Sequence, residues 1–189
     1  MSSFERSCAD PAEHVYGNAD RDPKRLVIAL GANQPLNAHK PAQTVAAALQ
    51  ALSEIFQAPR CSGLYRSPAW PDAGDPPFVN AVFVGETGLG PRAVLDLLHD
   101  VEAVFERQRR RANAPRTLDL DLVDWSGRII VPPSGEPTAL CLPHPRATQR
   151  DFVLAPLCEV WADWRDPQTG KRAAELLAAL ETVTAVPLK

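Results

Sequence analysis

The segment TLDLDLVDW at residues 117–125 constrains the fold more than any other part of this chain. Its leucines and aspartates alternate, and a β-strand sends successive side chains to opposite faces of a sheet. The three leucines therefore face a core, whereas Asp119 and Asp121 share the other, wetter face. The pattern predicts a strand in a sheet that buries at least one of its faces.

Further strands and helices follow from apolar periodicity and from the positions of proline and glycine. The predicted elements are a strand at 26–30, a helix at 41–56, strands at 60–67 and 78–86, a helix at 91–105 and a strand at 117–125. This β-α-β-β-α-β order predicts an α/β (α+β) fold with a ferredoxin-like core, in which two helices cover one face of an antiparallel sheet. Helical patterns near 152–161 and 171–181 predict a C-terminal extension of that core.

Size and composition favour one domain. A chain of 189 residues with 45% hydrophobic content can bury one substantial core, so we predict a single domain over 25–189 and a flexible leader over the polar residues 1–24. No stretch approaches the roughly 18 apolar residues of a membrane span. The four cysteines form no C-x-x-C pair, so we expect a cytoplasmic protein with free thiols.

Asp119 and Asp121 form a candidate metal site. Two residues along a strand span about 6.6–7 Å, so both carboxylates can ligate the same one or two magnesium ions. The alternative is an ordinary half-solvated strand, although aspartate is disfavoured in strands. Taken alone, the pair fits both interpretations.

Five arginines shortly precede the two aspartates: Arg107, Arg109, Arg110, Arg111 and Arg116. Cations beside carboxylates fit a phosphate that metal bridges to the protein, and arginine grips phosphate with two parallel hydrogen bonds. A cationic helix end explains one or two of them without any ligand. A nucleic-acid patch is the rival function, but no aromatic residues are interleaved for stacking, and the net charge of −3 offers little general attraction for nucleic acid or anionic lipid.

The combined pattern predicts transfer of a phosphoryl-type group from a magnesium–nucleotide complex. The chain has no G-x-x-x-x-G-K-[ST] motif, so it is not a P-loop enzyme. Phe78 and Asn80 share one face of their strand, and such a pair can stack on and hydrogen-bond a planar heterocycle. A core phenylalanine beside a turn-stabilising asparagine is the commoner interpretation, and His144 fits a structural role as well as a catalytic one.

Several segments together resemble the ordered signature of the 6-hydroxymethyl-7,8-dihydropterin pyrophosphokinase family of folate biosynthesis. They are ALGAN, YRSPAW, PPFVNAV, RTLDLDL, LPHPR and RDFVLAPL, spread from about residue 26 to 161. The resemblance implies a ferredoxin-like fold and transfer of pyrophosphate from ATP, with two Mg²⁺ ions, to the pterin hydroxymethyl oxygen, with release of AMP. We accordingly expect ATP and 6-hydroxymethyl-7,8-dihydropterin as partners, neither nucleic acid nor membrane, and a monomer or weak dimer.

The resemblance also implies roles for individual residues. It implies Arg107 and Arg116 as catalytic arginines and Asp119 and Asp121 as metal ligands. The residues implied to bind the pterin are Gly31, Ser67, Pro68, Trp70, Phe78, Asn80 and Phe152. The residues implied to bind ATP are Glu102, Arg109, Leu122, Leu140, His144 and Arg150.

The chain departs from the family pattern at two places. Asn113-Ala114 stand where the family often has Trp-Gly, and Ala139 stands where an arginine is often found. These departures bear on nucleotide affinity rather than on the chemistry. Two alternatives stay open: an RNA-binding module of the same fold that uses the arginine run, and a pterin-binding paralogue with weakened catalysis.

Overall fold

One antiparallel sheet organises the chain in the computed structural model, which describes residues 23–69, 74–106, 115–132 and 140–188. The elements are β1 (Lys24–Ala32), α1 (Pro41–Ile55), β2 (Gln57–Cys61), β3 (Tyr65–Ser67), β4 (Phe78–Thr87), α2 (Pro91–Val104), β5 (Asp119–Trp125), a 3-10 turn (Ala147–Gln149), α3 (Asp151–Val160), α4 (Ala173–Ala178) and β6 (Val186–Pro187). The predicted leader falls almost wholly on residues 1–22, outside the described residues.

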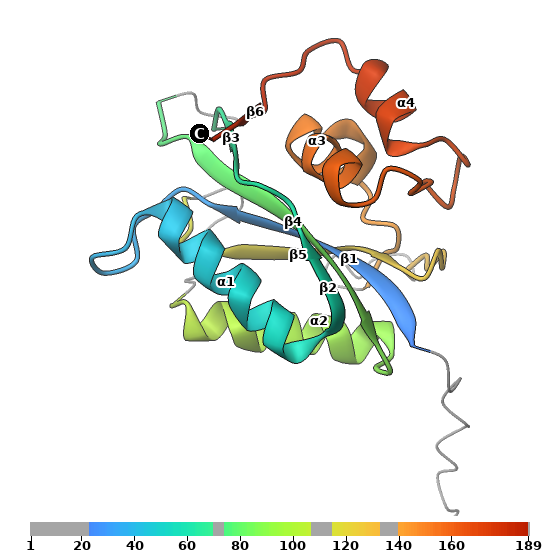
Figure 1. Cartoon of the computed structure of the whole chain (residues 1–189), viewed down its shortest axis with the longest axis horizontal. Coiled ribbons are helices and arrows are strands. Elements are labelled where there is room, and N and C mark those ends of the chain that lie inside the picture. Colours follow the sequence, from blue (N-terminus) through green and yellow to red (C-terminus); the bar gives the residue numbers. More distant parts are fainter. Residues whose placement is uncertain (1–22, 70–73, 107–114, 133–139, 189) are drawn as a thin grey trace, which may run out of the picture.

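The sheet has the strand order β5-β1-β4-β3-β6, with β2 also paired to β4, and every pairing is antiparallel (Figure 1). The predicted strand at 60–67 is divided into β2 and β3. At the break, the Ser62 hydroxyl accepts a hydrogen bond from Val82 N at 2.9 Å and so replaces a main-chain carbonyl in the ladder. This division lets β3 run along a different part of β4 from β2.

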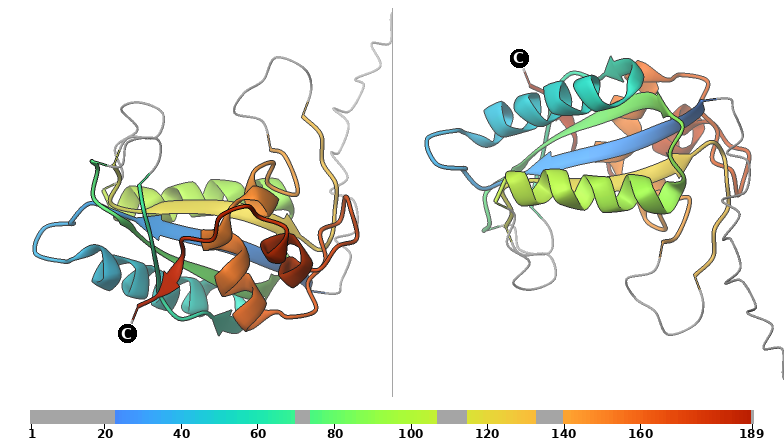
Figure 2. Two further views of the ribbon diagram at one scale, coloured as in Figure 1. Left: turned by 90° about the horizontal axis from the view of Figure 1, so that it is seen from above. Right: turned by 90° about the horizontal axis from the view of Figure 1, so that it is seen from below.

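The helices cover both faces of the sheet (Figure 2). On one face, α1 and α2 bury Leu52 and Leu98 against Leu26, Ile28 and Phe83 of the strands. These two helices are those predicted, and they confirm the ferredoxin-like core. Among the described residues, no helix is long and apolar enough to cross a membrane.

The C-terminal extension covers part of the opposite face. Here α3 contributes Leu154 and Leu157, and the loop that follows it contributes Trp164, to a second core against Val27 and Val82. The predicted helical patterns near 152–161 and 171–181 correspond to α3 and α4. Because α3 covers only part of this face, the rest of it is left to form a cavity.

A β-bulge interrupts the side-chain alternation of β5 after Val123. Ile28 of β1 pairs with Leu122, whereas Val27 pairs with Asp124, so Val123 is the extra residue. Val123 packs into the core beneath α3, on the same side as Asp121. Asp124 bonds to Trp164 of that core, so two successive side chains face α3. The predicted alternation holds from Asp119 to Val123 but not at Asp124.

Asp124, which follows the bulge, is a buried carboxylate that anchors the C-terminal extension. Its Oδ2 accepts a hydrogen bond from Trp164 Nε1 at 2.9 Å, and its Oδ1 accepts one from Gly127 N at 3.0 Å. Burial raises the pKa of Asp124 above its ordinary value, while both hydrogen bonds lower it in part. The folded protein therefore binds the proton of the Asp124 carboxyl group more tightly than the unfolded chain does. The contribution of Asp124 to stability falls as the pH rises from the pKa of the unfolded state through that of the folded state.

We expect Trp164→Phe to destabilise the fold by roughly 1–3 kcal/mol near neutral pH, because it leaves a buried carboxylate oxygen without its donor. The loss in free energy of unfolding should be smaller near about pH 4, because protonation of Asp124 reduces the need for that donor. Urea unfolding at the two pH values measures the difference. Trp161→Phe, on the same side of the sheet, serves as the control. A cost for Trp164→Phe that is independent of pH would contradict the expected role of the hydrogen bond.

Candidate active site

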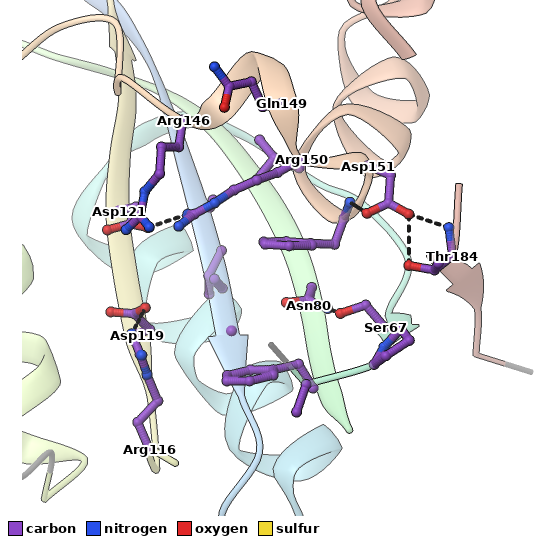
Figure 3. A pocket seen from close by; sticks show the side chains of 18 residues that line it. Ser67, Asn80, Arg116, Asp119, Asp121, Arg146, Gln149, Arg150, Asp151 and Thr184 are labelled. Atoms are coloured by element: carbon purple, nitrogen blue, oxygen red, sulfur yellow. Dashed lines mark hydrogen bonds and ion pairs between the residues drawn. The ribbon is translucent and has the colours of Figure 1, made fainter. Parts of the chain in front are cut away.

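A cavity of about 530 Å³ opens on the sheet face that α3 only partly covers. Its walls come from the ends of β1, β3, β4 and β5, from the turn that leads into α3, and from the C-terminal segment (Figure 3). This volume lies within the range of small-molecule sites.

The two aspartates of β5 line this cavity from the same side. Asp119 lies opposite Gly31 and Asp121 lies opposite Ala29 in the β1–β5 pairing, so the shared face predicted from the alternation is observed. Their side chains are 20% and 34% exposed, respectively. Both carboxylates are therefore accessible from the cavity while being partly shielded from bulk water.

Arginines reach these carboxylates from two directions (Figure 3). Arg116, just before β5, donates a hydrogen bond from Nη1 to Asp119 Oδ2. Arg150, at the start of α3, donates from Nη1 to Asp121 Oδ2 at 3.4 Å, and Arg146 lines the same wall. Guanidinium groups from separate segments thus converge on one edge of the cavity, an arrangement that suits a polyanionic ligand.

His144 lies next to Asp121, with 3.8 Å between His144 Nε2 and Asp121 Oδ2. Its Nδ1 accepts a hydrogen bond from Arg146 N at 3.2 Å, which assigns the proton of the neutral ring to Nε2. Burial lowers the pKa of His144 below its ordinary value, with partial compensation from Asp121. The imidazole is therefore a neutral donor around neutral pH, with its N–H on the side of Asp121.

The other end of the cavity is apolar and aromatic. Phe78 and Phe152 line it together with Ser67, Pro68 and Asn80. Asn80 is buried at the centre of the sheet, and its Nδ2 donates to Ser67 Oγ at 3.0 Å. The predicted grouping of an aromatic ring and a carboxamide is therefore present, with the second ring supplied by α3.

Gly31 allows these side chains to approach the strand closely. A Cβ at this position would lie 3.3 Å from Asn80 Oδ1 and 3.7 Å from Phe78 Cδ1. A larger residue would push the amide and the ring into the cavity. This close approach explains why a glycine suits this position.

The aromatic and charged ends adjoin. The guanidinium carbon of Arg116 lies 5.9 Å from the centroid of the Phe78 ring, and that of Arg150 lies 5.4 Å from the centroid of Phe152. These are cation–π distances. The arginines that pair with the aspartates therefore also adjoin the two rings, so a ligand can span both ends of the cavity.

Four of the predicted ATP-binding residues do not line this cavity: His144, which lies beside it next to Asp121, and Glu102, Leu122 and Leu140. Glu102 is buried in α2, where its Oε1 accepts a hydrogen bond from Leu120 N at 2.8 Å. Leu122 belongs to the core beneath α1 and α2, and Leu140 packs against that core. Their role in ATP binding stays a prediction.

Three other predicted site residues lie outside the described residues. Trp70 falls within residues 70–73, and Arg107 and Arg109 fall within residues 107–114. The structure therefore bears on one of the two predicted catalytic arginines, Arg116. The catalytic role of Arg107 stays a prediction.

Sequence reasoning assigned no role to Asn33, which follows β1 and is 2% exposed. Its Oδ1 accepts a hydrogen bond from Arg116 N at 2.8 Å, and its Nδ2 donates to Pro76 O at 3.1 Å. Asn33 thereby joins the segment that carries Arg116 to the one that leads into Phe78. Its place within ALGAN was visible, but these contacts span 83 and 43 residues and leave no local pattern.

The sequence patterns also gave no role to four polar or charged residues that line the cavity: Arg146, Gln149, Asp151 and Thr184. Arg146 and Asp151 do lie within the quoted motifs LPHPR and RDFVLAPL. Their positions within these motifs could have marked them as site residues. Their contacts could not be predicted from sequence spacing. Thr184 lies beyond every motif and reaches the cavity only because the C-terminal segment returns to the sheet.

The chemistry of the two carboxylates fits magnesium. Within the described ranges there is no group of three or more histidine, cysteine, aspartate or glutamate residues that could hold a metal ion. Mg²⁺ is usually bound by one or two carboxylates, with substrate phosphates and water completing its coordination. Asp119 and Asp121, open to a cavity edged by arginines, match that type of site.

Comparison with known proteins agrees with this chemistry. A sequence model of the family described as 7,8-dihydro-6-hydroxymethylpterin-pyrophosphokinase (HPPK) matches residues 27–162. The 2-amino-4-hydroxy-6-hydroxymethyldihydropteridine pyrophosphokinase of Synechocystis sp. is 35% identical over 138 residues, which cover 73% of this chain and 68% of that protein. The enzyme of the same name from Pseudomonas aeruginosa is 35% identical over 158 residues, covering 82% and 91%.

Solved structures with a similar fold include wild-type Plasmodium falciparum HPPK-DHPS with pteroate. It superposes with a TM-score of 0.60 at 13% identity, over 83% of this chain and 42% of that chain. The same protein with STZ-DHP gives a TM-score of 0.61 at 12% identity, over 83% and 41%. This chain thus spans less than half of those proteins, and at such identity the likeness shows the fold alone.

Proposed function

Because the chain belongs to the 7,8-dihydro-6-hydroxymethylpterin-pyrophosphokinase family, we propose that its cavity holds ATP at the aspartate end and the pterin at the aromatic end. The activity is that of a 2-amino-4-hydroxy-6-hydroxymethyldihydropteridine pyrophosphokinase of folate biosynthesis. It moves pyrophosphate from ATP to the hydroxymethyl oxygen of 6-hydroxymethyl-7,8-dihydropterin and releases AMP. One observation carries the placement: paired carboxylates and two aromatic rings line one cavity.

At the aromatic end, Phe78 and Phe152 would sandwich the pterin ring. Asn80 would read its edge, because the hydrogen bond from Nδ2 to Ser67 Oγ fixes the orientation of the amide and leaves Oδ1 towards the cavity side of Gly31. An amide oxygen held in this way accepts a hydrogen bond from a ring N–H. Such a buried, oriented acceptor selects a heterocycle that offers a donor.

At the charged end, Asp119 and Asp121 would hold two magnesium ions, which would neutralise the triphosphate and align the attacking and leaving oxygens. Once the carboxylates serve as metal ligands, Arg116 and Arg150 become available to donate forked hydrogen bonds to phosphate oxygens. The Nε2–H of His144 points towards the same edge and can donate a further hydrogen bond. These residues supply orientation and charge stabilisation, which dominate phosphoryl transfer.

The reaction is an in-line displacement. The pterin hydroxyl oxygen attacks the β-phosphorus of ATP, the bond from that phosphorus to the α,β-bridging oxygen breaks, and AMP departs with that oxygen. The adjacency of the rings to the arginines brings the two substrates together without a covalent enzyme intermediate.

The RNA-binding alternative is not favoured. A ferredoxin-like RNA-binding module stacks bases on the face of its sheet, but here α3 packs Leu154 and Leu157 against Val27 and Val82 on that face. The remaining uncovered part carries Asp119 and Asp121, which repel a phosphate backbone in the absence of metal.

The weakened-paralogue alternative is decided by an assay. We expect the full chain, mixed with ATP, Mg²⁺ and 6-hydroxymethyl-7,8-dihydropterin, to release AMP and form the pterin pyrophosphate in equal amounts. Separation of the nucleotides by chromatography distinguishes AMP from ADP, and a reaction without pterin controls for hydrolysis of ATP. ADP as product would contradict the proposed chemistry, and pterin binding without turnover would indicate the paralogue. The departures at Asn113-Ala114 and Ala139, which lie outside the described residues, bear on nucleotide affinity. The rate should therefore also be measured as a function of ATP concentration.

A further inference from the structure

The C-terminal segment, residues 184–188, contributes Thr184 to the cavity lining although it lies beyond the family match at 27–162. Within it, β6 pairs with β3, with Pro187 opposite Tyr65 and Val186 opposite Arg66. Leu188 N adds a hydrogen bond to Leu64 O at 2.7 Å. The segment therefore lies beside the strand that leads into Ser67 and Pro68.

One buried carboxylate holds the beginning of this segment. Asp151, 7% exposed, accepts hydrogen bonds at Oδ2 from Thr184 N and from Thr184 Oγ1 at 3.0 Å (Figure 3). The same oxygen accepts a hydrogen bond from Ala185 N at 2.8 Å. Its Oδ1 accepts a hydrogen bond from Phe152 N at 2.8 Å. Hydrogen bonds to an ionised acceptor are about twice as strong as neutral ones, so this is a firm anchor.

The anchor connects two walls of the aromatic end. Asp151 immediately precedes Phe152, and through residues 184–188 it supports β3, whose Ser67 accepts the hydrogen bond that orients Asn80. A shift of the C-terminal segment would therefore move Ser67 relative to Phe152. The spacing and orientation of these walls decide whether a flat ring fits between them.

The start of β3 also has a direct tie to α3. Glu159 accepts a hydrogen bond at Oε1 from Gly63 N at 3.0 Å and another at Oε2 from Tyr65 Oη at 3.1 Å. Glu159 does not line the cavity, whereas Asp151 does. Glu159 thus ties α3 to β3 directly and Asp151 ties it through residues 184–188, but only Asp151 lies at the ligand end.

We propose that Asp151 is a positioning residue for the pterin end of the site. It fixes Thr184 in the cavity wall and holds residues 185–188 beside β3, and thereby sets Ser67 relative to Phe152. This inference rests on the proposed function, since it assumes that the pterin occupies the aromatic end. Both oxygens of Asp151 are used by donors of the protein itself, so its role is to hold the walls rather than to react.

The test compares Asp151→Asn with Glu159→Gln. In Asp151→Asn an amide group faces donors that need an acceptor, so we expect Kd and KM for 6-hydroxymethyl-7,8-dihydropterin to rise about tenfold or more, with KM for ATP within about twofold of wild type. Glu159→Gln should leave both values near wild type. Thr184→Val, which removes one of the three donors to Oδ2, should give a smaller rise of about threefold in the pterin values.

Hydrogen exchange of the ligand-free proteins measures the positioning directly. Residues 64–68 should exchange faster in Asp151→Asn than in wild type, and this readout does not depend on pterin binding. If Asp151→Asn fails to fold, Thr184→Val decides the question by the same measurements. Unchanged pterin affinity, an equal rise in both KM values, or the same loss in Glu159→Gln would overturn the inference. Failure of wild type to bind pterin would instead overturn the proposed function.

Discussion

Replacing Asp121 by asparagine lowers kcat/KM by about 10³-fold or more, the largest effect that we expect from any single substitution in this protein. The carboxylate lies on the cavity wall, with Arg150 Nη1 at 3.4 Å and His144 Nε2 at 3.8 Å from its Oδ2. Asparagine keeps the shape of the side chain but removes the negative charge that a divalent cation requires. The substitution therefore removes metal binding while leaving the packing of β5 intact.

Stability should respond very differently from activity. Asp121 is 34% exposed and its ion pair with Arg150 is long, and exposed ion pairs contribute about 0–1 kcal/mol. We therefore expect the free energy of unfolding of Asp121→Asn to stay within about 1 kcal/mol of wild type. Asp96→Asn, which removes an exposed ion pair with Arg92 on α2, is the matched control and should preserve turnover.

Calorimetric titration with ATP separates metal binding from chemistry. Wild type should bind ATP more tightly with Mg²⁺ than without it, and Asp121→Asn should lose most of that difference. Turnover of Asp121→Asn at the wild-type rate would refute the metal assignment. A large loss of stability would show that the carboxylate has a structural role instead.

The part of the site that the sequence could predict is the part encoded by local periodicity. The placement of Asp119 and Asp121 on one face follows from their spacing of two along a strand, and the pairing with β1 preserves it. Phe78 and Asn80 obey the same rule in β4. Strand spacing is a backbone property, so tertiary packing did not alter it.

Contacts between distant segments were not predictable in this way. The bond from Arg116 N to Asn33 spans 83 residues and the bond from Ala185 N to Asp151 spans 34. Both depend on the antiparallel order β5-β1-β4-β3-β6, which brings the ends of these segments together. The bulge at Val123 likewise depends on how β1 pairs with β5, which the sequence of β5 alone does not specify.

The residues given roles by the family resemblance fall into two groups, those that line the cavity and those that lie in or against the core. Asn80 of β4, Asp119 of β5 and Phe152 at the start of α3 line the cavity. Leu122 and Glu102 have their side chains in or against the core beneath α1 and α2. A motif match gives a position in the chain, whereas the direction of a side chain follows from the strand or helix that carries it.

Arg116→Ala should lower kcat by about 10³-fold, as loss of an arginine that stabilises a transferred phosphoryl group does. Arg116 is held in place for such a role, because Asn33 binds its main chain at 2.8 Å and its guanidinium pairs with Asp119 beside the Phe78 ring. It therefore lies where the pterin hydroxyl would meet the phosphate chain. Since this charge matters most in the transition state, kcat should fall far more than KM for the pterin rises.

Arg116→Lys distinguishes charge from geometry. Lysine restores a positive charge but not the planar fork that binds two phosphate oxygens, so we expect it to recover only about tenfold of the loss in kcat. Arg92→Ala, on the exposed surface of α2, is the control and should leave both constants unchanged. Steady-state kinetics with each substrate varied in turn measures the separation. A rise in pterin KM with wild-type kcat would assign Arg116 to ground-state binding through the Phe78 ring rather than to the transfer step.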